Sequence, residues 1–88
     1  MSSEVTRVLG VDVSKSWFDV ASAMDGAVQR LASDAAGIDA VVRWAREMEA
    51  QRITIEASGG WQTQLVAALM QAGLPVIVVN PRQVREFA

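Results

Sequence analysis

The spacing of apolar residues predicts a three-stranded antiparallel meander in the first third of the chain. Asp19 alternates with Phe18 and Val20, which is the period of a strand with one buried face. Asp25-Gly26 then provides a hairpin signal, because glycine adopts positive φ without a steric penalty. The three predicted strands span residues 5–13, 17–23 and 27–31.

The apolar period lengthens to that of an amphipathic helix after this meander. Ser33 or Asp34 is a suitable N-cap residue, and the apolar positions that follow recur every three or four residues. Charged residues fill the positions between them, so one side of this helix should pack on a sheet. Trp44 lies beside the apolar stripe and should be half exposed. The residues expected on the buried side are Ile38, Val41, Val42, Ala45 and Met48.

A second helix is predicted over residues 61–72. It should end sharply, because Gly73 suits the left-handed position after a helix and Pro75 prevents continuation. The residues expected to point inward are Leu65, Val66, Leu69 and Met70.

Two more strands flank this second helix, over residues 52–56 and 76–79. The later one consists of four consecutive β-branched residues, a run typical of a strand buried on both faces of a parallel sheet. A further helix is expected over residues 82–88, with Pro81 in its first turn.

The element order β-β-β-α-β-α-β-(α) predicts one α/β domain over residues 1–88. A hairpin followed by right-handed crossovers gives a mixed five-stranded sheet of order 3-2-1-4-5, in which strands 1, 4 and 5 are parallel. Helices are expected on both faces of this sheet. The carboxyl ends of strands 1 and 4 then meet at one edge, where open α/β sheets bind ligands.

Two acidic residues, Asp12 and Glu56, end the strands that this topology makes neighbours. The axes of neighbouring strands lie ~4.8 Å apart, so both carboxylates can reach one divalent cation. Each residue also has a simpler interpretation: Asp12 could cap the turn that follows it, and Glu56 could be a solvated strand-end residue. The pair is our candidate catalytic and metal-binding site, and it supplies half of a site for phosphodiester chemistry. Asp19, a rival acid, is expected to be solvated.

Composition restricts the chemistry of these 88 residues. The chain contains no cysteine and no histidine, which excludes disulfides, thiolate catalysis, histidine acid–base catalysis and histidine-ligated zinc within it. Any metal must be held by oxygen ligands, which favours Mg²⁺, Mn²⁺ or Ca²⁺. A net charge of −2 does not by itself indicate nucleic-acid binding. No apolar run reaches the ~20 residues of a membrane span and no signal peptide is recognisable, so we expect a cytoplasmic protein.

Three sequence motifs carry a more specific signal. Gly-Val-Asp-Val-Ser-Lys occupies residues 10–15, Glu-Ala-Ser-Gly-Gly-Trp occupies residues 56–61, and Val-Asn-Pro-Arg-Gln-Val-Arg lies within residues 73–88. Together they resemble the N-terminal part of insertion-sequence transposases that carry a DEDD RuvC-like domain, the family that includes Piv-type DNA invertases. The resemblance covers essentially the whole chain, and it implies a ribonuclease H-like fold.

This resemblance implies a function and a set of site residues. Members of the family use four acids, of which the first two correspond to Asp12 and Glu56. The other two lie beyond the end of this sequence, as does a second catalytic domain with a serine nucleophile, so we expect a truncated N-terminal piece that is inactive alone. The implied reaction is metal-dependent DNA strand cleavage and transfer in transposition, with Mg²⁺ or Mn²⁺ bound by the complete four-acid site. The implied partners are DNA, a structured guide RNA and a second copy of the chain.

Four residues are candidate nucleic-acid contacts: Lys15, Trp61, Arg82 and Arg85. Trp61 follows a glycine pair beside the predicted acid site, and the two arginines lie one turn apart on the last predicted helix. Tryptophans more often pack in a core or interface, and charged residues on a terminal helix are usually just solvated.

Two other functions remain open on the sequence. Nucleotide-binding domains of the actin and sugar-kinase kind share this sheet order and a Gly-x-Asp motif on the first strand. A non-catalytic dimerisation module is the second alternative. Titration of the chain with ATP and with structured RNA would separate these interpretations.

Overall fold

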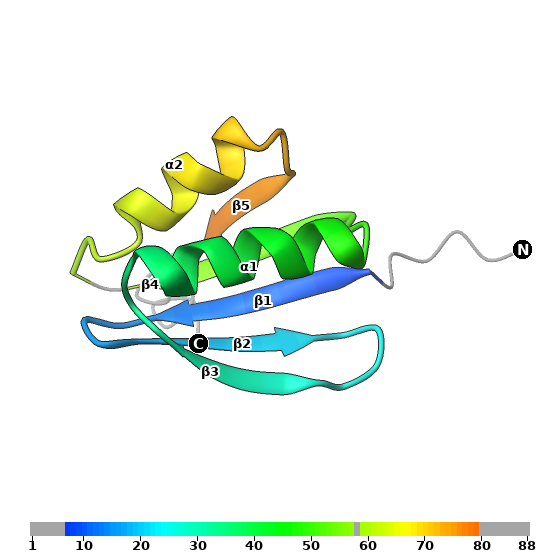
Figure 1. Ribbon diagram of the computed structural model, residues 1–88, viewed down its shortest axis with the longest axis horizontal. Coiled ribbons are helices and arrows are strands. Elements are labelled where there is room, and N and C mark those ends of the chain that lie inside the picture. Colours follow the sequence, from blue (N-terminus) through cyan, green and yellow to red (C-terminus); the bar gives the residue numbers. More distant parts are fainter. Residues whose placement is uncertain (1–6, 58, 80–88) are drawn as a thin grey trace, which may run out of the picture.

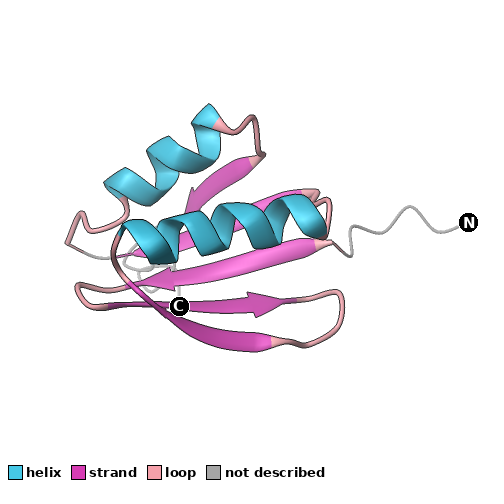
Figure 2. Ribbon diagram, viewed as in Figure 1, coloured by secondary structure: helices cyan, strands magenta, loops and turns pink. Residues whose placement is uncertain are grey.

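The computed structural model describes residues 7–57 and 59–79, which form a five-stranded sheet and two helices (Figures 1 and 2). The elements follow one another in the predicted order. The strands are β1 (Val8–Val13), β2 (Trp17–Ser22), β3 (Val28–Ala32), β4 (Arg52–Ala57) and β5 (Val76–Val79), and the helices are α1 (Ala35–Glu47) and α2 (Thr63–Gln71).

The strand order across the sheet is β3-β2-β1-β4-β5, as the sequence predicts. β1 and β3 both pair antiparallel with β2, whereas β4 pairs parallel with β1 and with β5. The α/β class and the mixed sheet are therefore confirmed. In the part of the chain that the structure describes, no helix is long and apolar enough to cross a membrane.

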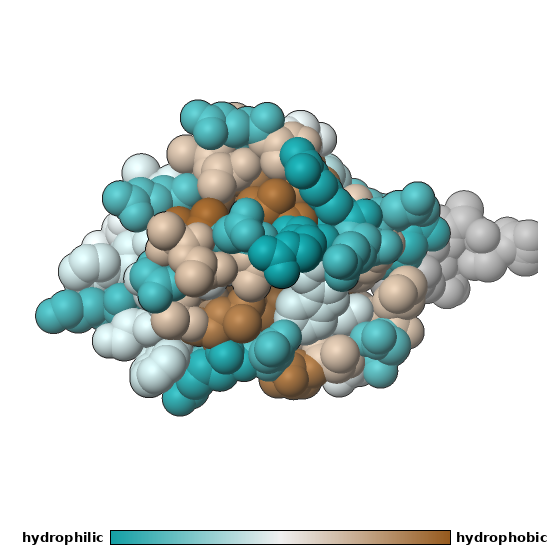
Figure 3. Space-filling view, in the orientation of Figure 1, coloured by the Kyte–Doolittle hydropathy of each residue, from teal (hydrophilic) through white to brown (hydrophobic). Residues whose placement is uncertain are grey.

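Both helices cover the same face of the sheet (Figure 1). Leu9, Val11 and Val13 point to this face from β1 and are buried, and α1 and α2 contact each other above it. Figure 3 shows small patches of hydrophobic residues on this side of the molecule, with hydrophilic residues around them. The helix expected on the opposite face, over residues 82–88, lies outside the described residues. The largest core side chains are Phe18, Leu9, Ile53, Ile55, Leu65, Leu69, Val11, Val20 and Val41.

The start of α1 is fixed by two contacts. Asp34 is the N-cap, and its Oδ1 accepts a hydrogen bond of 2.8 Å from the backbone N–H of Gly37. Gly37 itself lies against the end of β3, where an added Cβ would overlap the carbonyl oxygen of Ala32. The predicted cap is confirmed, and glycine is required because the helix backbone approaches the strand backbone closely.

The second helix is shorter than predicted. α2 begins at Thr63 rather than residue 61, because Gly59 and Gly60 adopt φ values of 81° and 79° and form a turn before it. Gly73 follows α2 with φ 75°, as predicted for its left-handed position. The inward placement of Met70 is wrong, since this side chain is 64% exposed. Only Leu65 and Leu69 of α2 are fully buried, because β5 is the last strand of the described sheet, which offers no further surface to a wider apolar stripe.

The expectation that β5 is buried on both faces is also wrong. Ile77 is 47% exposed and Val78 is 51% exposed, and these neighbours point to opposite faces. The physical reason is position: β5 is an edge strand that pairs only with β4 in the described part of the chain.

Candidate nucleic-acid processing site

The structure brings the two predicted acids together. Asp12 of β1 and Glu56 of β4 are register partners, and both side chains are exposed. Their sequence neighbours Val11, Val13 and Ile55 point into the core, so the two carboxylates lie on the face of the sheet that α1 and α2 leave open. This places two negative charges side by side near the carboxyl ends of parallel strands, on the face opposite to the two described helices.

A third carboxylate lies in the same row. Asp19 of β2 is the antiparallel partner of Asp12, which brings their Cβ atoms to ~4.5–5.5 Å. Asp19, Asp12 and Glu56, on β2, β1 and β4, are called the carboxylate row below. On its outer side Asp19 is the register partner of Arg30 in β3. The row therefore crosses the three inner strands of the described sheet, on its open face, and ends at a cation.

Arg30 neutralises Asp19 through a two-pronged ion pair. Arg30 Nε donates to Asp19 Oδ1 at 2.8 Å, and Nη2 donates to Oδ2 at 3.2 Å. These hydrogen bonds lower the pKa of the Asp19 carboxyl and raise the pKa of the Arg30 guanidinium. The guanidinium also lies over the ring of Trp17, 5.4 Å from its centroid. Asp19 is thus not simply solvated as expected. This ion pair could have been predicted from the hairpin turn at Asp25-Gly26, because the turn sets the register that pairs Asp19 with Arg30.

Asp12 and Glu56 fit a divalent metal in ligand type, but they are only two ligands. Carboxylate oxygens on neighbouring strands suit Mg²⁺ or Mn²⁺, and Asp19 is already committed to Arg30. Across residues 7–57 and 59–79, no group of three or more His, Cys, Asp or Glu side chains is arranged to hold a metal ion. A complete site needs oxygen ligands beyond this pair.

Two of the predicted nucleic-acid contacts line one cavity, in the connections that follow β1 and β4. Lys15 follows β1, three residues after Asp12, and Trp61 precedes α2, five residues after Glu56. Together with Ser33, Gly60, Thr63 and Gln64 they line a cavity of about 440 Å³. The other two predicted contacts, Arg82 and Arg85, lie outside the described residues.

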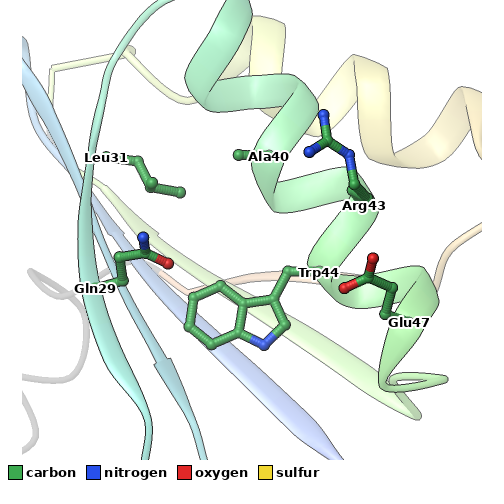
Figure 4. Close-up of a pocket in the computed structure, with 6 residues that line it drawn as sticks. All are labelled: Gln29, Leu31, Ala40, Arg43, Trp44 and Glu47. Atoms are coloured by element: carbon green, nitrogen blue, oxygen red, sulfur yellow. The ribbon is translucent and has the colours of Figure 1, made fainter.

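A second cavity, of about 390 Å³, lies between β3 and α1 (Figure 4). Trp44 extends from α1 toward β3 and forms one wall, which agrees with the predicted half exposure of this residue. Gln29 and Leu31 line the opposite wall. This cavity is on the helix-covered face, whereas Asp12 and Glu56 are on the open face, so it does not belong to the acid site.

Comparison with known proteins gives one finding. A family model described as a transposase, for the DEDD transposases of the IS110 group, matches residues 9–88. The match includes Asp12, Glu56, the residues around the larger cavity and the C-terminal segment. No curated protein matches the chain.

Proposed function

The chain belongs to the DEDD transposase family, and we propose that Asp12 and Glu56 are the first two of the four acids that perform its metal-dependent DNA strand cleavage and transfer. The observation that carries this proposal is the register pairing of the two acids on the exposed face. The family match also favours a transposase over the nucleotide-binding and dimerisation alternatives.

The sheet supplies the rigidity that such a site requires. Asp12 and Glu56 project from hydrogen-bonded parallel strands whose inner faces carry fully buried residues, among them Leu9 and Ile55. This core fixes the backbone positions of Asp12 and Glu56 at the ~4.8 Å spacing of neighbouring strands, so both carboxylates can reach a shared ion. A bound divalent cation would stabilise charge on the reacting phosphate. In this proposal the remaining two acids come from outside these 88 residues.

The nucleic-acid partner is proposed to approach over the edge that carries the acids. Lys15 and Trp61 stand at this edge, and they would contact the phosphates and bases of a strand. Arg82 and Arg85 are proposed as further phosphate contacts. A structured guide RNA and a second copy of the chain are proposed partners.

The test is strand cleavage by a transposase polypeptide that carries these residues together with the other two acids. Asp12→Asn and Glu56→Gln should each abolish nicking in Mg²⁺, because each removes a charged ligand. Asp39→Asn is the matched control: Asp39 is an exposed acid of α1 paired with Arg43, and its loss should leave cleavage intact. Cleavage that survives Asp12→Asn would refute the proposed role of this pair.

The 88-residue chain on its own should not cut DNA. Two carboxylates leave a Mg²⁺ ion without the near-octahedral shell it needs. Robust metal-dependent nicking by the purified chain would show that another acid completes the site, with Asp19 the nearest one.

A further inference from the structure

We propose that the larger cavity, lined by Lys15, Ser33, Gly60, Trp61, Thr63 and Gln64, is a binding site for one unpaired nucleotide of the DNA strand. In this arrangement the base stacks on Trp61 and a phosphate of the same strand lies at Lys15. The inference rests on the proposed function for the choice of DNA as ligand. Beyond the proposed function, it requires that the DNA nucleotide in this cavity be unpaired.

The cavity lies where the topology favours a ligand site. Lys15 follows β1, Ser33 follows β3, and Gly60 and Trp61 lie between β4 and α2. β1, β3 and β4 run in the same direction, so these three connections gather at the carboxyl edge of the sheet, on the left in Figure 1. Ligands of open α/β sheets bind in the crevice outside this edge.

Trp61 is exposed and at the same time held in place. Trp61 is 49% exposed, and it contacts the backbone of a neighbouring glycine. The pyrrole edge of the indole rests on Gly59, where an added Cβ would lie 3.0 Å from Nε1 and 3.3 Å from Cδ1. Because Gly59 has no side chain, the ring can lie against the backbone and keep the rest of its surface free. An exposed aromatic ring in a fixed orientation is a suitable stacking surface for a base.

The remaining lining is suited to a phosphorylated ligand. Among the described residues of the cavity lining, Lys15 is the only charged one, and hydroxyl and amide groups come from Ser33, Thr63 and Gln64. The Thr63 hydroxyl donates to the carbonyl of Gly60 at 3.2 Å, which braces the turn beneath the indole. The volume of about 440 Å³ falls within the ~300–1,000 Å³ range of small-molecule sites, which is enough for one nucleotide.

This geometry discriminates between paired and unpaired strands. A base can stack on Trp61 only after it leaves its own stack, because a duplex keeps both faces of each internal base covered. Lys15 and Asp12 are three residues apart around the end of β1, so a strand anchored in the cavity reaches the carboxylate row by passing over this edge. The cavity would therefore present a single strand to the acids.

The direct test is binding of fluorescently labelled oligonucleotides to the 88-residue chain without divalent metal, followed by anisotropy. Single-stranded DNA should bind more tightly than a blunt duplex of the same sequence. Trp61→Ala should weaken single-strand binding by about 5- to 150-fold, the range expected for loss of one stacked base. Trp44→Ala, in the other cavity, is the matched control and should bind like the unchanged protein.

Two further pairs of variants separate a binding role from loss of fold. Both Gly59 and Gly26 have a positive φ, of 81° and 76°, so alanine is strained at either position. In addition, the Cβ of Gly59→Ala would displace the indole, whereas Gly26 lies in a remote turn with open space around it. Of these two variants, only Gly59→Ala should weaken binding. Lys15→Gln should also weaken binding, and Arg52→Gln at the opposite end of the strands should not.

The proposal is overturned if duplex DNA binds as tightly as single-stranded DNA, or if Trp61→Ala leaves single-strand affinity unchanged. A single-stranded RNA of the same sequence forms a third arm, and binding of RNA alone would contradict the assignment to DNA. These outcomes do not depend on Asp12 or Glu56. Failure of this site is therefore distinguishable from failure of the acid pair, which is measured by strand cleavage and by metal binding.

Discussion

Asp12 and Glu56 occupy paired register positions on the parallel strands β1 and β4, on the face of the sheet that the two described helices leave uncovered. Neither residue has a side-chain hydrogen bond or ion pair within the described ranges that would explain its position structurally. Asp12 in addition stands between Glu56 and Asp19, so it has a carboxylate neighbour on each side. Such an arrangement costs stability, since like charges directly opposite one another in a sheet repel.

Neutralising the central acid should therefore not weaken the fold. We expect Asp12→Asn to leave the free energy of unfolding unchanged or to raise it by up to about 1 kcal/mol, because it relieves the like-charge contact with Glu56 and a weaker one with Asp19, whose charge Arg30 offsets. Glu56→Gln should behave in the same way, with one such contact relieved. Urea unfolding followed by circular dichroism measures both. The comparison is Asp34→Ala, which removes the α1 cap and should lower stability by about 1 kcal/mol. A comparable loss for Asp12→Asn would identify Asp12 as a structural residue.

The Asp19–Arg30 ion pair predicts a specific pH response. The hydrogen bonds from Arg30 hold the pKa of Asp19 below its ordinary value of 3.8. The ion pair therefore contributes fully to the stability of the fold above pH 3.8. This contribution to stability is lost as the pH falls through the lowered pKa that Asp19 has in the folded state. We expect an NMR titration of the Asp19 carboxyl to show this lowered midpoint, and Arg30→Gln to return it to the ordinary range. High salt should also raise the pKa of Asp19, because salt ions screen the attraction within this exposed ion pair. A midpoint insensitive to Arg30→Gln would contradict the pairing.

Gly37→Ala distinguishes tertiary packing from helix propensity. In an isolated helix this change would be favourable by about 1 kcal/mol. Here the new methyl group would overlap the Ala32 carbonyl, so α1 or the end of β3 must shift. We expect a net loss of about 1–3 kcal/mol in the free energy of unfolding, measured by urea denaturation. An increase in stability would mean that α1 does not lie against β3 as described.

The exposed apolar strand β5 predicts self-association of the chain. Ile77 and Val78 present apolar side chains on both faces of an edge strand, and such edges pair with other chains. Sedimentation should show association at high concentration, and Ile77→Lys should reduce it. Val28→Lys, at the opposite edge of the sheet, should have little effect. A wild-type chain that remains monomeric at the highest concentrations would show that β5 is not an association surface.

The fold followed from sequence because its local signals agree with one another. The Asp25-Gly26 turn, the Asp34 cap and the Gly73 helix end each appear where the sequence indicated them. The errors in predicted burial lie at the sheet edge, where Met70 and the β5 side chains are more exposed than their apolarity suggested. Hydrophobicity shows that a residue can be buried, but whether another layer covers it depends on tertiary structure.

The acid pair of the candidate site could also be predicted from local sequence patterns. Strand parity and sheet order place Asp12 beside Glu56, and both can be derived from sequence patterns. The cavity around Trp61 could not be derived, because it depends on three connections that meet only in the folded chain. The left-handed turn at Gly59 and Gly60, which fixes the indole, was likewise visible only as a glycine pair.

The central claim, that Asp12 and Glu56 hold a divalent metal together, is tested most directly by titrating the 88-residue chain with Mn²⁺ and recording NMR spectra. The account predicts weak binding, with a Kd of about 1 mM or higher, since two carboxylates leave most of the coordination shell to water. Paramagnetic broadening should centre on the carboxyl ends of β1 and β4, and it should vanish in Asp12→Asn while persisting in Asp39→Asn. Broadening that is absent from these strand ends, or that survives Asp12→Asn, would contradict the claim.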